Sequence, residues 1–191
     1  MADVRLTADL HLGHPKVARE RGFASVAAHD DAVLGNLAKG ASERTLLWVL
    51  GDVVFGPDKA GLLRRLRDEV PGRKRLVLGN HDKLHPAVAP NADWGAWSDV
   101  FEQVHTMAQV KHDGKVLLLS HFPYDGDHTD ESRFDQWRLR DMGDALAHGH
   151  THASQRTSRS ANGTVQVHVG LDAWRLRPAA LHDVCTIAWA D

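Results

Sequence analysis

Five short apolar runs along the chain each end in polar side chains that can bind a metal ion or carry a proton. The runs are residues 4–8, 46–50, 76–78, 116–120 and 145–147, and the polar residues that follow them are Asp9 and His11, Asp52, Asn80 and His81, His121, and His150 and His152. Short apolar runs of this kind are typical of buried parallel strands. Because ligands in open α/β sheets bind beyond the carboxyl ends of the strands, we expect these side chains to converge on one site.

The segments between the first runs have the spacing of helices. Residues 26–39 place apolar side chains at near-helical intervals and are followed by Gly40, which predicts an amphipathic helix that ends there. Residues 59–70 repeat this pattern, with three leucines facing inward. The first half of the chain therefore alternates strands with helices.

The second half of the chain consists mostly of predicted strands. They cover residues 104–112, 115–120, 164–169 and 182–189. The first two form a hairpin across Asp113-Gly114, which is a strong turn signal. A strand–helix alternation followed by strands favours two mixed sheets packed face to face with helices outside them. We therefore expect one domain over residues 1–191 of the α/β (α+β) class, a four-layer αββα sandwich.

The composition is that of an ordinary globular domain. Of the 191 residues, 42% are hydrophobic and 25% are charged, and the longest unbroken apolar run, residues 46–50, is too short to span a membrane. The first strand begins by Val4, which leaves no room for a signal peptide, so a cytoplasmic location is the default expectation. The single cysteine, Cys185, excludes an internal disulfide and a cysteine-rich zinc site, and we expect it in the core.

Histidine is the unusual component, with fourteen residues in the chain. Imidazole is the commonest metal ligand and the natural proton carrier near neutral pH. The strand ends combine imidazoles with carboxylates and an amide oxygen, a donor set that suits Mn, Fe, Zn, Co or Ni better than Ca or Mg. The seven donors suit two cations about 4 Å apart that share a carboxylate, the arrangement of hydrolases that act on phosphate. They are Asp9, His11, Asp52, Asn80, His121, His150 and His152.

Taken in order, the strand-end motifs resemble those of the calcineurin-like metallophosphoesterase superfamily. They are Asp-x-His at 9–11, Gly-Asp at 51–52, Gly-Asn-His-Asp at 79–82, His121, and Gly-His-x-His at 149–152. Each motif is weak by itself, but the complete set in this order is highly specific. The small size of the chain makes the resemblance closest to bacterial or phage members that hydrolyse phosphodiesters.

The resemblance implies a division of the seven donors between two metal ions. One ion would be held by Asp9, His11 and His152, the other by Asn80, His121 and His150, and both would share Asp52. A water that bridges two such cations loses its proton near neutral pH and attacks phosphorus in line. Two divalent transition-metal ions are therefore the expected cofactors, with Mn first among them.

The resemblance also implies roles for residues that are not permanent ligands. His81 would contact a phosphate oxygen and protonate the leaving oxygen as the general acid, and Asp82 would orient the His81 ring. Asn80 and His14 are expected to contact the substrate phosphate. For His14, which precedes Pro15, the alternative is a surface turn.

The expected function is a phosphodiesterase acting on nucleotide-type substrates, cyclic ones included. A nuclease or nucleotide phosphatase is a second reading, and an inactive metal-binding scaffold for a protein partner is a third. The net charge of -2 does not support nucleic-acid binding, although six basic residues form a local group. They are Arg64, Arg65, Arg67, Arg73, Lys74 and Arg75. No membrane partner is expected.

Two segments outside the motifs are also expected near the site. Residues 123–143 are charged and carry little core signal, which is typical of a substrate-facing loop or lid, or else of a surface loop. As a lid, this segment would offer Arg133, Arg138 and Arg140 to the substrate. Residues 171–178 are expected to reach the rim of the site.

Overall fold

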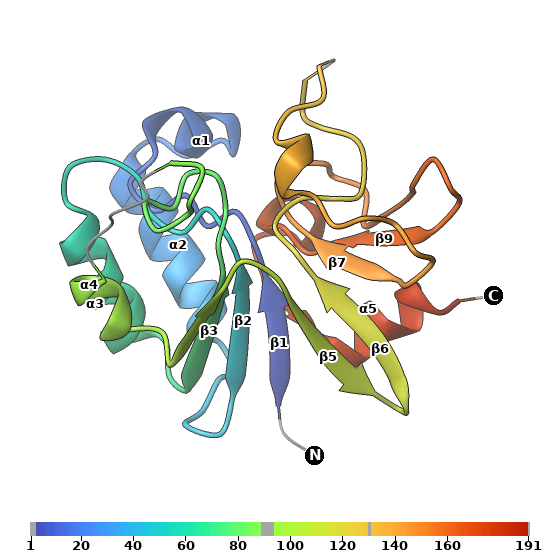
Figure 1. The fold of residues 1–191 in the computed structure, drawn as a ribbon. Coiled ribbons are helices and arrows are strands. Elements are labelled where there is room, and N and C mark those ends of the chain that lie inside the picture. Colours follow the sequence, from blue (N-terminus) through green and yellow to red (C-terminus); the bar gives the residue numbers. More distant parts are fainter. Residues whose placement is uncertain (1–2, 89–93, 130, 191) are drawn as a thin grey trace.

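The first of two β-sheets holds most of the N-terminal half of the chain. The computed structural model describes residues 3–88, 94–129 and 131–190, and Figure 1 shows the two sheets side by side. The strands of the first sheet, in the order β10-β1-β2-β3-β4, are Ala179–Ala180, Val4–Thr7, Leu46–Leu50, Arg73–Val77 and Gln103–His105. Strands β1 to β4 are parallel, and β10 pairs antiparallel with β1. The carboxyl ends of β1, β2 and β3 therefore lie at one edge.

Three helices cover the outer face of the first sheet: α2 (Val26–Ala38), α3 (Lys59–Glu69) and α4 (Gly95–Ser98). Helix α1 (Pro15–Glu20) packs against α2 at the end of the molecule toward which the parallel strands run (Figure 1). Ser25 caps α2 by accepting a hydrogen bond from the Ala28 amide, and Asp58 caps α3 through the Gly61 amide. The apolar sides of α2 and α3 pack against one face of the sheet at Val49 and Leu76, as the periodicity predicts.

The second sheet is also five-stranded and mixed. Its strands, in the order β5-β6-β7-β9-β8, are Ala108–His112, Lys115–Leu119, Leu146–His148, Val165–His168 and Thr157–Arg159. The central strands β6, β7 and β9 are parallel, and each edge strand is antiparallel to its neighbour. The predicted hairpin across Asp113-Gly114 is confirmed as the β5–β6 connection, where both residues have a positive φ.

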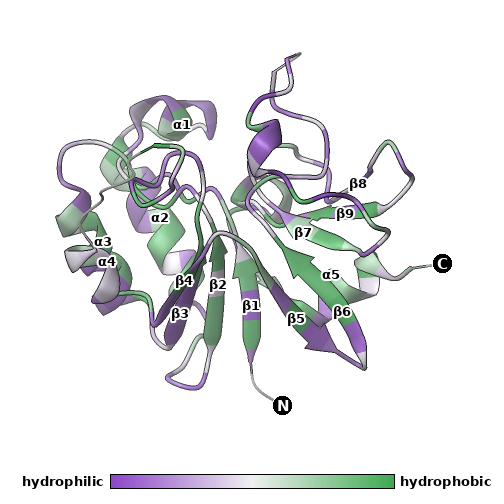
Figure 2. Ribbon diagram, in the orientation of Figure 1, coloured by the Kyte–Doolittle hydropathy of each residue, from purple (hydrophilic) through white to green (hydrophobic). Residues whose placement is uncertain are grey.

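The inner faces of the two sheets share a hydrophobic core. Leu6 and Trp48 of the first sheet belong to the same buried cluster as Leu117 and Val167 of the second. Figure 2 shows the apolar strands gathered in the centre, with hydrophilic segments at the end of the molecule where α1 lies. The expected mixed α/β fold of two sheets flanked by helices is confirmed.

The prediction of a strand over residues 182–189 is wrong. This segment belongs to α5 (Leu181–Ala188), which packs against strands of both sheets. Its buried residues are Leu181, Val184, Cys185 and Ala188, a spacing that places them on one side of a helix. Cys185 is nevertheless in the core, as expected.

The region expected to lack long elements, residues 84–103, contains among its described residues the short helix α4 and the first residue of β4. Trp97 is buried against Phe101, whereas Trp94 is 52% exposed, so only one of the two tryptophans packs as expected. Residues 89–93 of this region lie outside the described part. Among the described residues, no helix is both long and apolar enough to cross a membrane.

Candidate metal centre

The structure brings the five predicted strand ends to one place. The loop after β1 carries Asp9 and His11 and runs beside the loop after β2, because the Asp9 amide donates to Gly51 O at 3.0 Å and the His11 amide to Asp52 O at 2.9 Å. On the second sheet, the Gly149 amide donates to His121 O at 3.0 Å. The backbone thus holds the motif loops in register before any side chain takes part.

Five of the seven predicted metal ligands have a left-handed backbone conformation. The φ angles are 57° at Asp9, 48° at His11, 56° at Asp52, 70° at His150 and 51° at His152. Non-glycine residues seldom adopt this region, and such strain concentrates at functional sites. The loops therefore turn sharply at the ligands, which aims the side chains inward.

Two glycines allow the loops after β2 and β3 to come this close. A side chain at Gly51 would collide with the backbone of Gly79 and with the His121 ring, and a side chain at Gly79 would collide with Asp52. The glycines that precede Asp52 and Asn80 in the motifs are therefore required by the close approach of the two loops.

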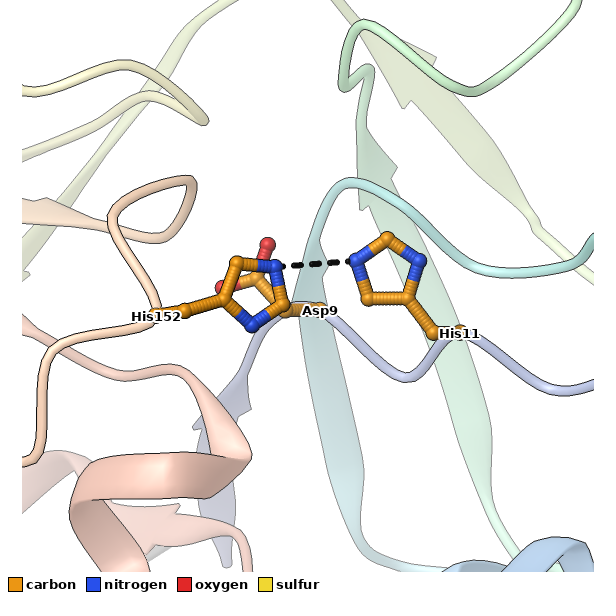
Figure 3. A group of neighbouring side chains, drawn as sticks. All are labelled: Asp9, His11 and His152. Atoms are coloured by element: carbon orange, nitrogen blue, oxygen red, sulfur yellow. Dashed lines mark hydrogen bonds between the residues drawn. The ribbon is translucent and has the colours of Figure 1, made fainter. Parts of the chain in front are cut away.

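One group of donors consists of Asp9, His11 and His152, and Figure 3 shows the three side chains converging. The Nε2 atoms of His11 and His152 lie 3.1 Å apart. Donor atoms of all three residues lie within 4.8 Å of one another. Asp9 and His11 are almost completely buried, with exposed fractions of 0% and 3%.

A second group forms around the side-chain oxygen of Asn80. His121 Nε2 and His150 Nδ1 each lie 3.0 Å from Asn80 Oδ1. Asp52 lies between the two groups, since its Oδ2 is 3.7 Å from His11 Nε2 and 3.6 Å from His121 Nε2. All seven predicted ligands are thus brought together, and Asp52 approaches a ring nitrogen of each group. Asp9, of the first group, also has an oxygen 4.0 Å from His121 Nδ1.

These residues fit divalent cations. The rings of His11 and His152 point nitrogens at one another, and those of His121 and His150 point nitrogens at one amide oxygen, so four imidazoles aim at two small volumes. Buried carboxylates and imidazoles in this number need a compensating charge, which cations supply. The donor set is the mixed nitrogen and oxygen set that transition-metal ions prefer.

The protonation of these groups reflects their crowding. Burial raises the pKa of Asp52, with the nearby histidines opposing the shift. Burial would also raise the pKa of Asp9, but hydrogen bonding and charge from His168, His152 and His121 lower it well below its usual value. Burial lowers the pKa of His11. At His121 and His152 the effect of burial is outweighed by neighbouring aspartates, chiefly Asp52 and Asp172, and the pKa is raised. A metal ion would displace the protons of these two rings, because a ligating imidazole must be neutral.

Asp82 is placed differently from expectation. Its carboxylate accepts hydrogen bonds from the backbone amides of Asp52 and Val53, both at 3.0 Å, and of Gly79 at 2.8 Å. It is 0% exposed, and burial together with the charge of Asp52 raises its pKa to about 6. Among the described residues, none of its hydrogen bonds reaches the His81 ring, so the geometry supports a role in joining the β2 and β3 loops rather than in orienting that ring.

His81 and His14 border an open cleft of about 790 Å³. The His81 ring is exposed and lies 5.6 Å from the His11 ring, measured between centroids. His14 stacks on Phe55 with a centroid distance of 4.0 Å and also begins α1, where its Nδ1 accepts a 3.4 Å hydrogen bond from the Val17 amide. His14 therefore both lines the cleft and caps α1.

The segment 123–143 meets this cleft through some of its residues only. His128 and Arg133 line the cleft opposite Lys16 of α1, and Figure 1 shows both segments at the same end of the molecule. Arg138 was expected to contact substrate, but its side chain is 5% exposed and donates to Pro123 O and Arg133 O. Arg138 therefore holds the segment together, and Arg140 is exposed outside the set of cleft residues.

Sequence reasoning missed three charged residues that lie near the predicted metal ligands. Asp172 lies 2.9 Å from His152 Nδ1, Asp127 lies 3.1 Å from His150 Nε2, and Arg21 makes two 2.9 Å hydrogen bonds to Asp172. The expectation that residues 123–143 and 171–178 lie near the site covers the segments of Asp127 and Asp172 without naming either residue, and nothing pointed to Arg21. None belongs to a motif, because their proximity arises from tertiary folding.

A two-sheet α/β fold that gathers carboxylates, an amide and imidazoles at its strand ends is that of a metal-dependent hydrolase of phosphoesters. The calcineurin-like phosphoesterase superfamily domain matches residues 4–186, and the chain belongs to this superfamily.

Relatives of this chain include two phage proteins. The Gene 66 protein of Mycobacterium phage D29 is 45% identical over 183 residues, which cover 91% of this chain and 90% of the relative. The Gene 66 protein of Mycobacterium phage L5 is 42% identical over 188 residues, covering 91% and 88%. The fold is similar to that of AQ665 from Aquifex aeolicus, a protein of unknown function whose crystal structure superimposes with a TM-score of 0.72. The match covers 97% of this chain and 99% of AQ665, at 22% sequence identity, and it supports the fold.

Proposed function

We propose that the chain is a phosphodiesterase that uses two divalent transition-metal ions, Mn first among them, and acts on nucleotide-type diesters, cyclic ones included. The observation that carries this proposal is the position of Asp52 between two groups of donors. Its Oδ2 lies 3.7 Å from His11 Nε2 and 3.6 Å from His121 Nε2, so one carboxylate can serve both ions. When bound, the two ions supply Lewis acidity toward the phosphate and a water of lowered pKa.

The ligands divide into two sets in this proposal. Asp9, His11 and His152 hold one ion, Asn80, His121 and His150 hold the other, and Asp52 is shared. The short distances between donors within each set support the division. The backbone strain at five of these residues pre-organises the set, because the loops hold the side chains in place without the ions.

His81 acts as the general acid. Its ring is exposed to the cleft, next to the ligand His11, so it can reach a leaving oxygen on a phosphate held at the ions. A general acid is needed because an alkoxide leaves poorly. Burial and the charge of His121 lower the pKa of His81, so protonation of its ring depends on the negative charge of a phosphate placed beside it.

His14 and Asn80 contact the substrate in this proposal. His14 lines the cleft beside His81, and Asn80 places its side-chain amide between the two histidines of its group. The same cleft is also lined by the basic or polar side chains of Lys16, His128 and Arg133, which suits an anionic substrate.

The basic group over residues 64–75 gives little support to a nuclease. Arg65 pairs with Glu69 and Asp31, Arg67 with Asp68, and Arg75 with Glu102. A phosphate backbone would have to displace these carboxylates.

The test is hydrolysis by metal-stripped protein reconstituted with Mn. Bis-p-nitrophenyl phosphate, p-nitrophenyl phosphate and 2′,3′-cyclic AMP are compared at equal concentration. Faster turnover of the diesters supports the proposal, and a preference for the monoester would replace it with a phosphatase. No turnover with any metal, despite two bound ions, would favour the scaffold alternative.

A further inference from the structure

The two histidines of the Gly-His-x-His motif each turn one ring nitrogen toward the metal centre and the other toward an aspartate. His152 presents Nε2 to His11, and its Nδ1 lies 2.9 Å from Asp172 Oδ2. His150 presents Nδ1 to Asn80, and its Nε2 lies 3.1 Å from Asp127 Oδ2. In both rings one nitrogen faces the metal centre and the other faces an aspartate, although the inward nitrogen is Nε2 in His152 and Nδ1 in His150.

Each aspartate is in turn held by arginine. Arg21 binds both oxygens of Asp172 at 2.9 Å, and its side chain is only 5% exposed. Arg133 lies 2.8 Å from Asp127 Oδ1, and Arg138 lies 3.5 Å from Asp127 Oδ2. The Asp127 side chain is 1% exposed, so this carboxylate is committed to its protein partners.

We propose that Asp172 and Asp127 are positioning residues, each of which sets the affinity of one of the two metal positions by holding one histidine ligand. The inference rests on the proposed ligand sets. A carboxylate on the outer nitrogen of a ligating histidine fixes its tautomer and ring orientation and makes it a better donor. Asp172 acts on the position that His152 shares with Asp9 and His11, and Asp127 acts on the position that His150 shares with Asn80 and His121.

Arg21 extends the support of His152 into the first sheet. It donates to Asp9 O at 2.8 Å and contacts His29 Nε2 at 3.1 Å. His29 Nδ1 lies 2.8 Å from Asp30, and Asp30 accepts hydrogen bonds from the Gly13 amide. One connected network thus joins His152 to the backbone of the loop that carries the other ligands of its position.

The support of His150 comes instead from the segment 123–143. The contact of His150 Nε2 with Asp127 is close, but that nitrogen lacks an aligned hydrogen bond among the described residues. The segment therefore belongs to the metal centre, besides bordering the cleft.

Asp127, His128 and His150 also lie close enough together to suggest a third cation. Arg133 occupies that place, since its Nη2 lies 2.8 Å from Asp127 Oδ1 and 3.0 Å from His128 Nε2. A cation there would meet a carboxylate already paired with two guanidinium groups. We therefore assign Asp127 to His150 and expect two ions per chain.

The test is Mn binding to metal-stripped full-length chain by competition with a chelator, together with the metal content at saturation. Asp127→Asn is expected to lower the affinity for one of the two ions by about 10- to 100-fold. Asp172→Asn is expected to lower the affinity for the other ion by a similar factor. Asp135→Asn is the matched control for Asp127, because Asp135 pairs with Arg138 in the same segment without touching His150. Asp3→Asn is the control for Asp172→Asn, because it breaks a 2.9 Å ion pair with Arg5 far from the metal centre.

Double variants assign each effect to a position. In an Asn80→Ala background Asp127→Asn is expected to have little further effect, whereas in a His11→Ala background it still weakens the remaining ion. The reverse pattern is expected for Asp172→Asn. A carboxylate that supports only the fold would lower the free energy of unfolding and weaken both ions alike, which would overturn the inference.

Several other outcomes are decisive. Wild-type affinity in both aspartate variants, or three ions in the wild type, would contradict the assignment, whereas failure of the wild type to bind any ion would contradict the proposed ligand sets instead. If Asp127→Asn does not fold, Arg133→Gln removes the partner of the carboxylate and is expected to weaken the same ion by a smaller factor. Unchanged binding in Arg133→Gln would then count against the inference.

Discussion

The loops after the first sheet and the loops after the second hold their metal-facing side chains by different means. On the first-sheet side, the Asp82 carboxylate joins the β2 and β3 loops through three backbone amides, and Asp9 is tied to Gly51 through the backbone. On the second-sheet side, His150 and His152 depend on Asp127 and Asp172. Backbone hydrogen bonds hold the loops on both sides, and on the second side each of the two histidines is also supported by an aspartate from another segment.

One site thus has a side on which the ligand-bearing loops share hydrogen bonds and a side on which a separate aspartate supports each of two histidines. Damage to the first side changes the geometry of several ligands at once, because the loops share hydrogen bonds. Damage to a support on the second side changes one histidine. Substitutions on the two sides should therefore differ in how many functions they remove.

Asp52→Ala is expected to have the largest effect, because this residue faces both donor groups. Both ions should bind much more weakly, and diester hydrolysis should fall by at least about 1,000-fold, as for loss of a metal-dependent nucleophile. Metal content and turnover measured on the same preparation check this. An Asp52→Ala protein that binds two ions and remains active would contradict the proposal that Asp52 is a ligand of both.

His81→Ala should separate catalysis from metal binding. Two ions should remain, while hydrolysis of a diester with a poor leaving group slows by about 100- to 1,000-fold, and that of a p-nitrophenyl diester by much less. The reason is that an activated leaving group needs little protonation. Equal losses on both substrates would contradict the role of His81 as an acid.

Asp82→Asn tests the joint between the first-sheet loops. An amide cannot accept all three backbone hydrogen bonds, so the free energy of unfolding should fall by about 2–4 kcal/mol. Urea unfolding in the presence of EDTA measures this without the ions. Asp68→Asn, at a surface pair with Arg67, is the control and should change stability by less than about 0.5 kcal/mol. Equal losses of unfolding free energy in the two variants would contradict the role of Asp82 in connecting the β2 and β3 loops.

The sequence predicts that the seven candidate donors converge, and the structure brings them together because each follows a strand whose direction the fold determines. Asp9, Asp52 and Asn80 meet because β1, β2 and β3 are parallel neighbours. Their left-handed backbones are invisible in the sequence, since they depend on contacts between loops. Asp127 and Asp172 are likewise invisible, because nothing near them in the chain marks a carboxylate that faces a histidine.

The error over residues 182–189 has a local cause. Val184, Thr186 and Ile187 are β-branched and favour a strand, whereas the buried residues of α5 recur at intervals of three and four. Burial against strands of both sheets outweighs the β-branched content, so the helix forms. The periodicity carried the correct signal.

His148 provides a test of pH dependence on the second-sheet side. Burial, followed by the charge of His168, lowers the pKa of His148 to about 3. Between that value and the ordinary pKa of about 6.5, only the unfolded chain binds the proton, so His148 destabilises the metal-free protein as pH falls through this window. His148→Gln should reduce the slope of the unfolding free energy by up to about 1.4 kcal/mol per pH unit. Urea titrations in EDTA at several pH values measure it, and the exposed His182→Gln is the control; an unchanged slope in His148→Gln would contradict the prediction.

His14→Ala should have the smallest effect, since His14 lines the cleft without belonging to either donor group. We expect the KM for a diester to rise by about 3- to 10-fold, because a lost contact to a charged group is worth about 1 kcal/mol at a partly exposed site, while kcat and metal content stay nearly unchanged. His14 also caps α1, so His14→Asn, which keeps a capping side chain, distinguishes the contact from the cap. A KM restored to the wild-type value in His14→Asn would assign the effect to the helix cap. A fall in kcat with unchanged KM would instead place His14 in the chemical step, on the same footing as His81.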